Sequence, residues 1–426
     1  MSKQYEDTCF YRKTTLDNGL RIITEEVPYF QSVSLGIWIR AGSRFEPPNL
    51  NGICHFIEHM LFKGTERRSA RAIAREIDCV GGGLNAFTSK ELSSFYCKIL
   101  HENLELAVDL LTDIFLNASF PEDEIEREKL VIIQEIRQLE DSPEELVHEM
   151  LTTSFWKGDP LGQPILGTES NIMGLDRDTL MAFRQQSYTP SETIICAAGK
   201  LRHEALVEMI AARMDGLAAR ETIDRPAFPS SNSSSQVVER DLEQVHLCLG
   251  TGGPSAVDEG RHTAYVLNTI FGSGMSSRLF QEIREKNALA YSVYSFISSF
   301  SDTGLFGIYA GCDPSRLEEL IAILKSESAA LPSSITEEDM LTAKQQIRGN
   351  ILLAMESSEA RMNRLAKGEY FFDRFISTDE IINSLEKVQY AELTELAEQM
   401  ISSGSFSTVA LGPFKEGEDP FYTFHP

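Results

Sequence analysis

The stretch Asn51-Gly-Ile-Cys-His-Phe-Ile-Glu-His-Met-Leu-Phe62 carries three reactive side chains within five positions: His55, Glu58 and His59. The stretch has the apolar spacing of a helix. On a helix, side chains three and four positions apart share a face, with their Cβ atoms about 5–6 Å apart. His55 and His59 can therefore aim at one point, and Glu58 reaches the same point from the side.

The order His-x-x-Glu-His is the inverted form of a zinc peptidase motif, in which two imidazoles hold Zn²⁺. Glu58 is then expected to act as general base on zinc-bound water and to pass the proton to the leaving amine, for a gain of about 10²–10⁴-fold. The alternative is a histidine pair on the half-buried polar edge of an amphipathic helix. The five-residue pattern alone does not decide between the two.

A catalytic zinc site needs a third protein ligand beside water. Residues 121–137 predict a helix that offers Glu128 and Glu135 two turns apart on one face. From this spacing, either carboxylate could reach the metal.

Several further motifs follow one another along nearly the whole chain. They are Leu16-Asp-Asn-Gly-Leu-Arg21, Gly42-Ser-Arg44, His55-Phe-Ile-Glu-His-Met-Leu-Phe-Lys-Gly-Thr65, Gly82-Gly-Leu-Asn-Ala-Phe-Thr88, Glu135-Ile136, Pro160-Leu-Gly-Gln-Pro-Ile-Leu-Gly-Thr168, Gly274-Met-Ser-Ser-Arg-Leu-Phe-Gln-Glu-Ile-Arg-Glu285 and Leu289-Ala-Tyr-Ser292. In these motifs the chain resembles the insulinase and mitochondrial-processing-peptidase family of zinc peptidases (the pitrilysin clan), in its short bacterial form. So many motifs in the right order make chance similarity negligible.

The resemblance implies roles for individual residues. Glu135 corresponds to the third zinc ligand, and Glu128 to a glutamate that supports the ligands. Asn85 and Ala86 match the strand on which a peptide substrate adds itself to the sheet edge. The local alternative for Asn85 and Ala86 is a β-bulge with an Asn turn residue.

Arg284 and Tyr291 match a pair that orients the peptide and stabilises the oxyanion in two-unit members of the family. Such donors can supply several kcal/mol. The local alternative is that Arg284 interacts with the end of its own helix and that Tyr291 is an ordinary strand residue. Asn287-Ala288 stands where the family usually has an Arg-Gly-like pair, so the turn before Leu289 could differ from that of the family and place Tyr291 differently.

The 426 residues suggest two domains, and the Pro- and Ser-rich tract at residues 226–235 suggests where they join. We expect a catalytic domain at residues 1–218, a linker at 219–236 and a related domain without a metal site at 237–426. Each half reads as strands with helices packed to one side, which predicts an α+β fold. Each domain would be a mostly antiparallel sheet covered by helices, and together they would form half of a clamshell.

The composition of the chain limits the kinds of partner and compartment that we expect. The net charge of −25 argues against nucleic acid, which needs clustered Lys and Arg. The acidic residues could line a cavity that attracts basic peptides, or they could form a solvated outer surface. No apolar run approaches the roughly 18 residues of a membrane span. With seven cysteines and no Cys-x-x-Cys pair, a cytoplasmic protein with reduced thiols is expected.

The sequence therefore predicts a zinc-dependent endopeptidase that cleaves unfolded peptides or presequences inside a closed chamber. By resemblance, we expect a homodimer, or a heterodimer with a related chain. The alternative is a non-catalytic or partner-dependent subunit of a heteromeric processing peptidase. Because His55, Glu58, His59 and Glu135 are all present, the sequence favours the enzyme over an inactive subunit.

Overall fold

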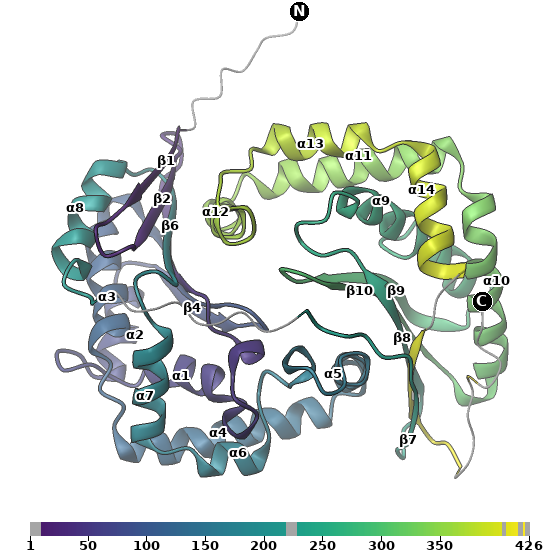
Figure 1. Cartoon of the computed structure of the whole chain (residues 1–426), viewed down its shortest axis with the longest axis horizontal. Coiled ribbons are helices and arrows are strands. Elements are labelled where there is room, and N and C mark those ends of the chain that lie inside the picture. Colours follow the sequence, from purple (N-terminus) through teal and green to yellow (C-terminus); the bar gives the residue numbers. More distant parts are fainter. Residues whose placement is uncertain (1–9, 219–227, 403–405, 416–420, 422–426) are drawn as a thin grey trace, which may run out of the picture. The chain divides into compact units, whose positions relative to one another are not determined.

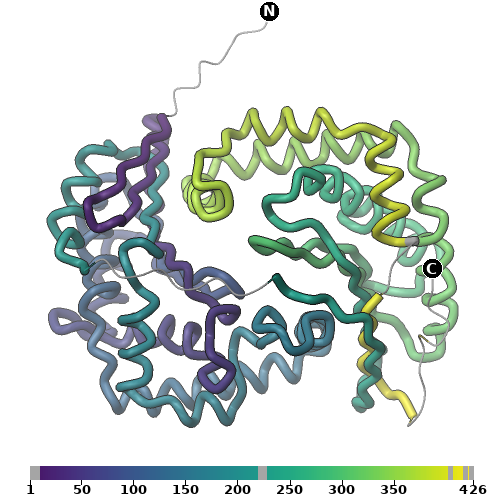
Figure 2. The backbone as a smooth tube through the Cα atoms, viewed as in Figure 1, coloured from purple at the N-terminus to yellow at the C-terminus, as the bar shows by residue number. Residues whose placement is uncertain are grey.

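The computed structural model describes residues 10–218, 228–402, 406–415 and 421. Its chain forms two compact units, each built from three stretches (Figures 1 and 2). The first unit comprises Met1–Ile136, Gln163–Pro226 and Leu353–Ile376. The second comprises Arg137–Gly162, Ala227–Leu352 and Ser377–Pro426. Part of the expected linker, residues 219–227, lies outside the described residues.

The first unit holds a six-stranded sheet in the order β1-β2-β6-β3-β5-β4. Its strands are β1 (Phe10–Thr15), β2 (Arg21–Glu26), β3 (Ser32–Ile39), β4 (Gly83–Thr88), β5 (Ser93–Leu100) and β6 (Thr193–Gly199). Its helices are α1 (Ile53–Leu61), α2 (Ala70–Asp78), α3 (Leu104–Asn117), most of α4 (Glu122–Glu140), α6 (Glu169–Gly174), α7 (Arg177–Ser187), α8 (His203–Met214) and α12 (Ser358–Phe372). The β2–β6 pair is parallel, and the other strand pairs are antiparallel.

Both faces of the first sheet are covered. Val33, Leu35 and Ile37 alternate along β3, which predicts that they share one face, and they point into the core shared with α1, α3 and α8. Trp38 points to the opposite face, where it packs with Met362 of α12. β3 is therefore buried along nearly its whole length.

Asn18-Gly19 between two strand-like segments predicts a two-residue type I′ turn, but the β1–β2 hairpin turns differently. A two-residue type I′ turn at Asn18-Gly19 needs positive φ at both residues. Only Gly19 has it (φ 93°), and Leu16 and Leu20 close a three-residue loop through a 2.9 Å hydrogen bond from Leu16 N to Leu20 O. The side chain of Asn18 instead accepts a hydrogen bond from Leu20 N, and the loop has the pattern of a type I turn followed by a glycine bulge.

The second unit repeats this plan, without a counterpart of β1 among its described residues. Its sheet has the order β7-β11-β8-β10-β9, again with one parallel pair, β7–β11. The strands are β7 (Ser235–Glu239), β8 (Val245–Gly253), β9 (Ala290–Ser299), β10 (Gly304–Cys312) and β11 (Ser407–Gly412). The helices are α5 (Pro143–Phe155), α9 (Arg261–Phe271), the π-helix η5 (Phe280–Lys286), α10 (Leu317–Ser334), most of α11 (Glu337–Ala354), α13 (Thr378–Lys387) and α14 (Tyr390–Ala397). Two mostly antiparallel sheets covered by helices confirm the α+β prediction.

The units are not contiguous halves of the chain, because each half gives one helix to the other unit. Helix α5 packs on β8 and β11 of the second sheet, with Val147, Leu151 and Phe155 in a shared core. Helix α12 packs on β3 and β6 of the first sheet. The pattern of residues 336–366 predicts one long helical segment, but the chain breaks between α11 and α12, where Ser357 caps α12. No helix in the described part of the chain is long and apolar enough to cross a membrane.

Candidate metal centre

Helix α1 carries the three reactive side chains on its less buried side. Its apolar residues are buried against the first sheet and its helices; they are Ile53, Cys54, Phe56, Ile57, Met60 and Leu61. His55, Glu58 and His59 are only half-buried and share the opposite side. Burial of the apolar face therefore fixes the rotation of the helix about its axis, and this rotation places the three reactive side chains on the same side.

A buried carboxylate holds the beginning of α1. The N-cap residue Gly52 has φ 99° and no side chain to cap the helix. The side chain of Glu46 caps the helix instead. It accepts hydrogen bonds at 2.8 Å from the backbone N–H groups of Gly52 and Cys54 and from the side chain of Asn51. A Cβ at position 52 would meet Leu166 O at 2.8 Å, so only glycine fits there.

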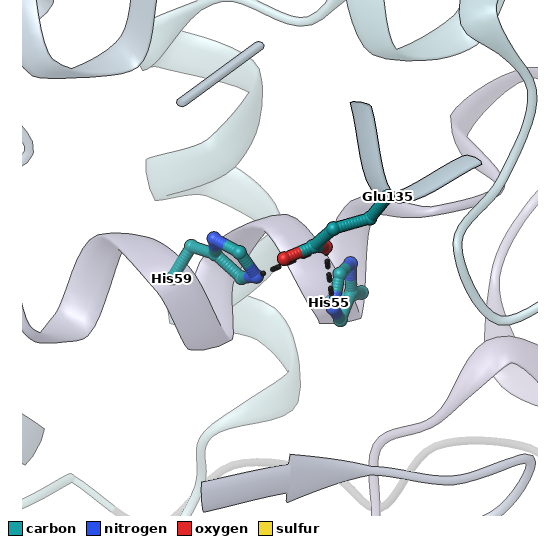
Figure 3. A group of neighbouring side chains, drawn as sticks. All are labelled: His55, His59 and Glu135. Carbon is teal, nitrogen blue, oxygen red and sulfur yellow. Dashed lines mark ion pairs between the residues drawn. The ribbon is translucent and has the colours of Figure 1, made fainter. Parts of the chain in front are cut away.

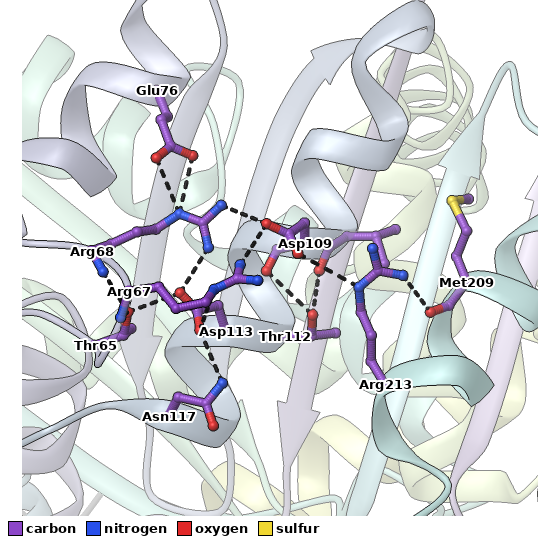
Figure 4. Close-up of polar contacts among 11 residues, drawn as sticks. Thr65, Arg67, Arg68, Glu76, Asp109, Thr112, Asp113, Asn117, Met209 and Arg213 are labelled. Atoms are coloured by element: carbon purple, nitrogen blue, oxygen red, sulfur yellow. Dashed lines mark hydrogen bonds and ion pairs between the residues drawn. The ribbon is translucent and has the colours of Figure 1, made fainter.

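An ion network fixes the chain that leaves α1 (Figure 4). Arg68 donates to Asp113 of α3 at 2.7 Å and to Glu76 of α2 at 3.0 Å. The hydroxyl of Thr65 donates to the same Asp113 at 2.8 Å. The side chain of Asp113 is nearly fully buried, and Asn117 donates to its second oxygen. Both ends of the histidine helix are therefore anchored.

Helix α4 brings Glu135 to the two histidines (Figure 3). Its Oε2 lies 3.6 Å from Nε2 of His55 and 3.5 Å from Nε2 of His59. One ligand atom from each of the three residues lies within 4.8 Å of the other two, the only such group of three among the described residues. The spacing on two helices thus brings His55, His59 and Glu135 together.

The second glutamate of α4 lies behind His59. Oε2 of Glu128 is 2.8 Å from Nδ1 of His59, and its Oε1 is 2.6 Å from the ammonium group of Lys63. Because Nδ1 is engaged by Glu128, Nε2 of His59 is left to face Glu135. A carboxylate behind a ligating imidazole fixes the orientation of its ring.

The donor set fits a zinc ion. Two imidazole nitrogens and one carboxylate oxygen make up a common set of three protein ligands in catalytic zinc sites. Burial, and then the nearness of His59, lower the pKa of His55 to about 3, so its imidazole is neutral and has a free lone pair near pH 7. Oε2 of Glu135 is buried and makes no hydrogen bond to the described residues. A cation between these atoms would satisfy that oxygen.

Glu58 lies beside this group without belonging to it. Its Oε2 accepts a 2.6 Å hydrogen bond from the hydroxyl of Thr88 at the end of β4. Burial raises the pKa of Glu58 above its ordinary value, although the Thr88 bond and His59 oppose the shift.

Comparison with known proteins identifies the family. The model of the insulinase family (peptidase family M16) matches residues 21–169, and the model described as the peptidase M16 inactive domain matches residues 174–347. The chain is 38% identical over 394 residues to the uncharacterized zinc protease YmxG of Bacillus subtilis, covering 92% of this chain and 96% of that protein. The chain belongs to the insulinase family. The expected family is therefore confirmed.

Other relatives agree. An uncharacterized zinc protease of Streptomyces coelicolor is 37% identical over 414 residues, covering 95% of this chain and 90% of that protein. A solved protease from Helicobacter pylori superposes with a TM-score of 0.87 at 21% identity, covering 95% of this chain and 100% of that chain. At this identity the match shows the M16 fold. The second half of the chain carries no His-x-x-Glu-His motif.

In this insulinase-family chain, Asn85 and Ala86 lie on strand β4 at the edge of the first sheet, and β5 is its one partner in the part of the chain that the structure describes. The backbone N–H of Ala86 is bonded to the side-chain oxygen of Asn85 at 2.9 Å. In an antiparallel pair, both backbone groups of one residue face the same way. The N–H and C=O of Ala86 therefore point to the open edge, where an extended peptide could add.

Arg284 and Tyr291 lie in the second unit and contact each other. The guanidinium carbon of Arg284 is 4.5 Å from the ring centroid of Tyr291 and 4.7 Å from that of Phe280. Tyr291 is 79% exposed. Between them, Ala288 adopts φ 48°, a left-handed conformation that usually requires glycine. The turn thus has glycine-like geometry although the sequence departs from the family pattern.

Sequence reasoning missed three supporting residues: Glu46, Lys63 and Thr88. Each lies in a quoted motif or next to one, yet none bears a metal-ligand signature. The alternation of β4 is the one signal that could have indicated the position of Thr88, because it places Leu84, Ala86 and Thr88 on one side of the strand.

Proposed function

We propose that this member of the insulinase family is a zinc-dependent endopeptidase acting on unfolded peptides. The observation that carries the proposal is the approach of His55, His59 and Glu135 around one point, with Glu58 beside them. A zinc ion bound there would polarise the scissile carbonyl and supply water of lowered pKa.

Glu58 is the general base of the proposed reaction. Its carboxylate accepts a proton from the attacking water and delivers it to the leaving amine. Burial raises its pKa above that of an exposed glutamate, which makes the carboxylate a stronger base. Glu128 and Lys63 keep the His59 ring aligned throughout.

The peptide substrate is proposed to bind as an added strand along β4, through main-chain hydrogen bonds to Ala86. Arg284 and Tyr291 are proposed to orient it and to stabilise the oxyanion. Their mutual stacking supports a joint role, because each side chain limits the rotation of the other. The closed chamber, and a preference for basic peptides, remain predictions from the resemblance and from the net charge of −25.

Metal analysis and peptide cleavage test the function. Purified protein should contain one zinc per chain and cleave an unfolded, basic peptide. Glu58→Gln should retain the zinc and lose activity, whereas Glu66→Gln, which removes an exposed carboxylate beyond the end of α1, should keep both the zinc and the activity. A zinc-loaded but inert wild type would instead favour the non-catalytic subunit, and cleavage only with a second chain would favour the partner-dependent one.

The oligomeric state is a separate proposal. We expect a homodimer, or a heterodimer with a related chain. Sedimentation of active protein measures this directly, and an active monomer would contradict the proposal without affecting the metal chemistry.

A further inference from the structure

Thr88 connects the edge strand to the proposed general base. It is the last residue of β4, and its side chain shares a face with Leu84 and Ala86, which pack against the core that contains α1. Its hydroxyl lies 2.6 Å from Oε2 of Glu58. This is a short, charge-assisted hydrogen bond between two residues 30 positions apart.

The position of Thr88 is fixed by its surroundings. The turn after β4 is closed by hydrogen bonds from Ser89 N to Leu92 O at 2.7 Å and from Leu92 N to the Ser89 hydroxyl at 3.0 Å. The carbonyl of Lys90 in this turn accepts a hydrogen bond from Arg44 N at 2.8 Å. The backbone that carries Thr88 is therefore held from two sides.

The proton of the Thr88 hydroxyl is directed to Glu58. Among the described residues, this hydroxyl has a second oxygen within hydrogen-bond distance, the Ser93 hydroxyl at 3.3 Å. The hydroxyl of Ser93 donates its own proton to the carbonyl of Ala41 at 2.7 Å, so toward Thr88 it can act only as a distant acceptor. Thr88 therefore donates its proton to the carboxylate, which is the closer and stronger acceptor.

We propose that Thr88 is a positioning residue that orients the Glu58 carboxylate and ties it to strand β4. This inference rests on the proposed function, in which Glu58 is the base and β4 holds the peptide. The same strand then fixes both the scissile bond, through Ala86, and the base, through Thr88. A base displaced by about 1 Å loses on the order of 10²-fold in rate.

Three variants separate positioning from packing. Thr88→Val keeps the shape of the side chain and removes the hydroxyl, and Thr88→Ser keeps the hydroxyl. Thr193→Val is the matched control, because Thr193 is a buried strand residue whose hydroxyl donates to Thr189 O, away from these residues. We expect Thr88→Val to lower kcat by about 10–100-fold, with KM and zinc affinity unchanged. Thr88→Ser should restore most of kcat, and Thr193→Val should keep it.

A stability cycle tests the contact without peptide cleavage. The melting temperature of the zinc-free protein is measured for Thr88→Val, Glu58→Ala and the double variant. If Thr88 serves Glu58, Thr88→Val lowers the melting temperature in the wild type and has little effect beside Glu58→Ala. Additive shifts, or equal kcat for Thr88→Val and wild type, would overturn the proposal. If wild type cleaves nothing, the proposed function fails, and this cycle still decides whether Thr88 holds Glu58.

Discussion

Nδ1 of His59 lies 2.8 Å from Oε2 of Glu128, so a second carboxylate supports the ring that faces Glu135. Glu128 is itself held by Lys63. We predict that Glu128→Gln weakens zinc binding by about 10–100-fold, because the neutral amide orients the imidazole less firmly. Competition with a chelator measures the affinity. Glu126→Gln, with its side chain 66% exposed on the same helix, is the control and should bind zinc like wild type.

The cap of α1 predicts a stability effect. Glu46→Ala leaves two backbone N–H groups and the Asn51 amide without their acceptor in a buried place. We expect the free energy of unfolding to fall by about 3 kcal/mol. Urea unfolding of Glu46→Ala and of the exposed control Glu102→Ala gives the comparison. A loss as small as that of Glu102→Ala would show that α1 needs no such cap.

The ion network around Asp113 predicts how stability depends on pH. Burial alone would raise the pKa of Asp113, but hydrogen bonds from Asn117, Arg68 and Thr65 outweigh it and hold the pKa below its usual 3.8. A lowered folded pKa means that the contribution is present above pH 3.8 and is lost as pH falls through the folded value.

Asp113→Asn should therefore lower the melting temperature at pH 7, at a cost of about 1–3 kcal/mol. The difference from wild type should shrink as pH falls below 3.8. Thermal melts between neutral and acid pH measure this. Asp241→Asn, at an exposed position, should follow wild type throughout, and a constant difference for Asp113→Asn would contradict the assignment.

The helices that carry the candidate metal ligands could be predicted from the sequence, because their signals are local. The pattern of residues 121–137 predicted the helix that the structure shows as α4 (Glu122–Glu140), and the spacing of His55 and His59 predicted that their side chains converge. Glu128 and Glu135 could not be told apart by spacing, since both lie on one face of α4. The structure distinguishes them by their position along the helix. Glu135 faces Nε2 of the histidines, and Glu128 lies behind His59, at its Nδ1.

Other features were hidden because they depend on distant parts of the chain. The pattern of α12 shows that it has a buried face but does not say which sheet covers it, so its exchange into the first unit was missed. The contact between Glu58 and Thr88 joins a helix to a strand end and follows from the register of β4 on β5. The turn at Gly19 was misjudged because one more residue, Asp17, belongs to the loop.

The stacked pair in the second unit predicts a catalytic effect without a structural one. Tyr291→Phe keeps the ring over Arg284 and removes only an exposed hydroxyl. If that hydroxyl stabilises the oxyanion, kcat should fall by about 10²-fold with zinc affinity and melting temperature unchanged. Steady-state kinetics on an unfolded peptide measure the change. Tyr265→Phe, another partly exposed tyrosine, should be fully active, and an unaltered kcat for Tyr291→Phe would remove the residue from the reaction.

The open edge of β4 gives a test of peptide binding. Ala86→Pro removes the backbone N–H that points away from β5, and proline is tolerated on edge strands where the ladder does not use its nitrogen. Losing one main-chain hydrogen bond should raise KM by about 5–10-fold, while zinc affinity is kept.

Ala86→Gly is the matched control, because it also changes the side chain but keeps the N–H. In the free protein this N–H is bonded to Asn85, so an added peptide strand must displace the Asn85 side chain to reach it. Kinetics with one unfolded peptide compare the two variants. A KM that rises equally in both would trace the effect to the changed side chain at position 86, and peptide addition through this N–H would then be wrong.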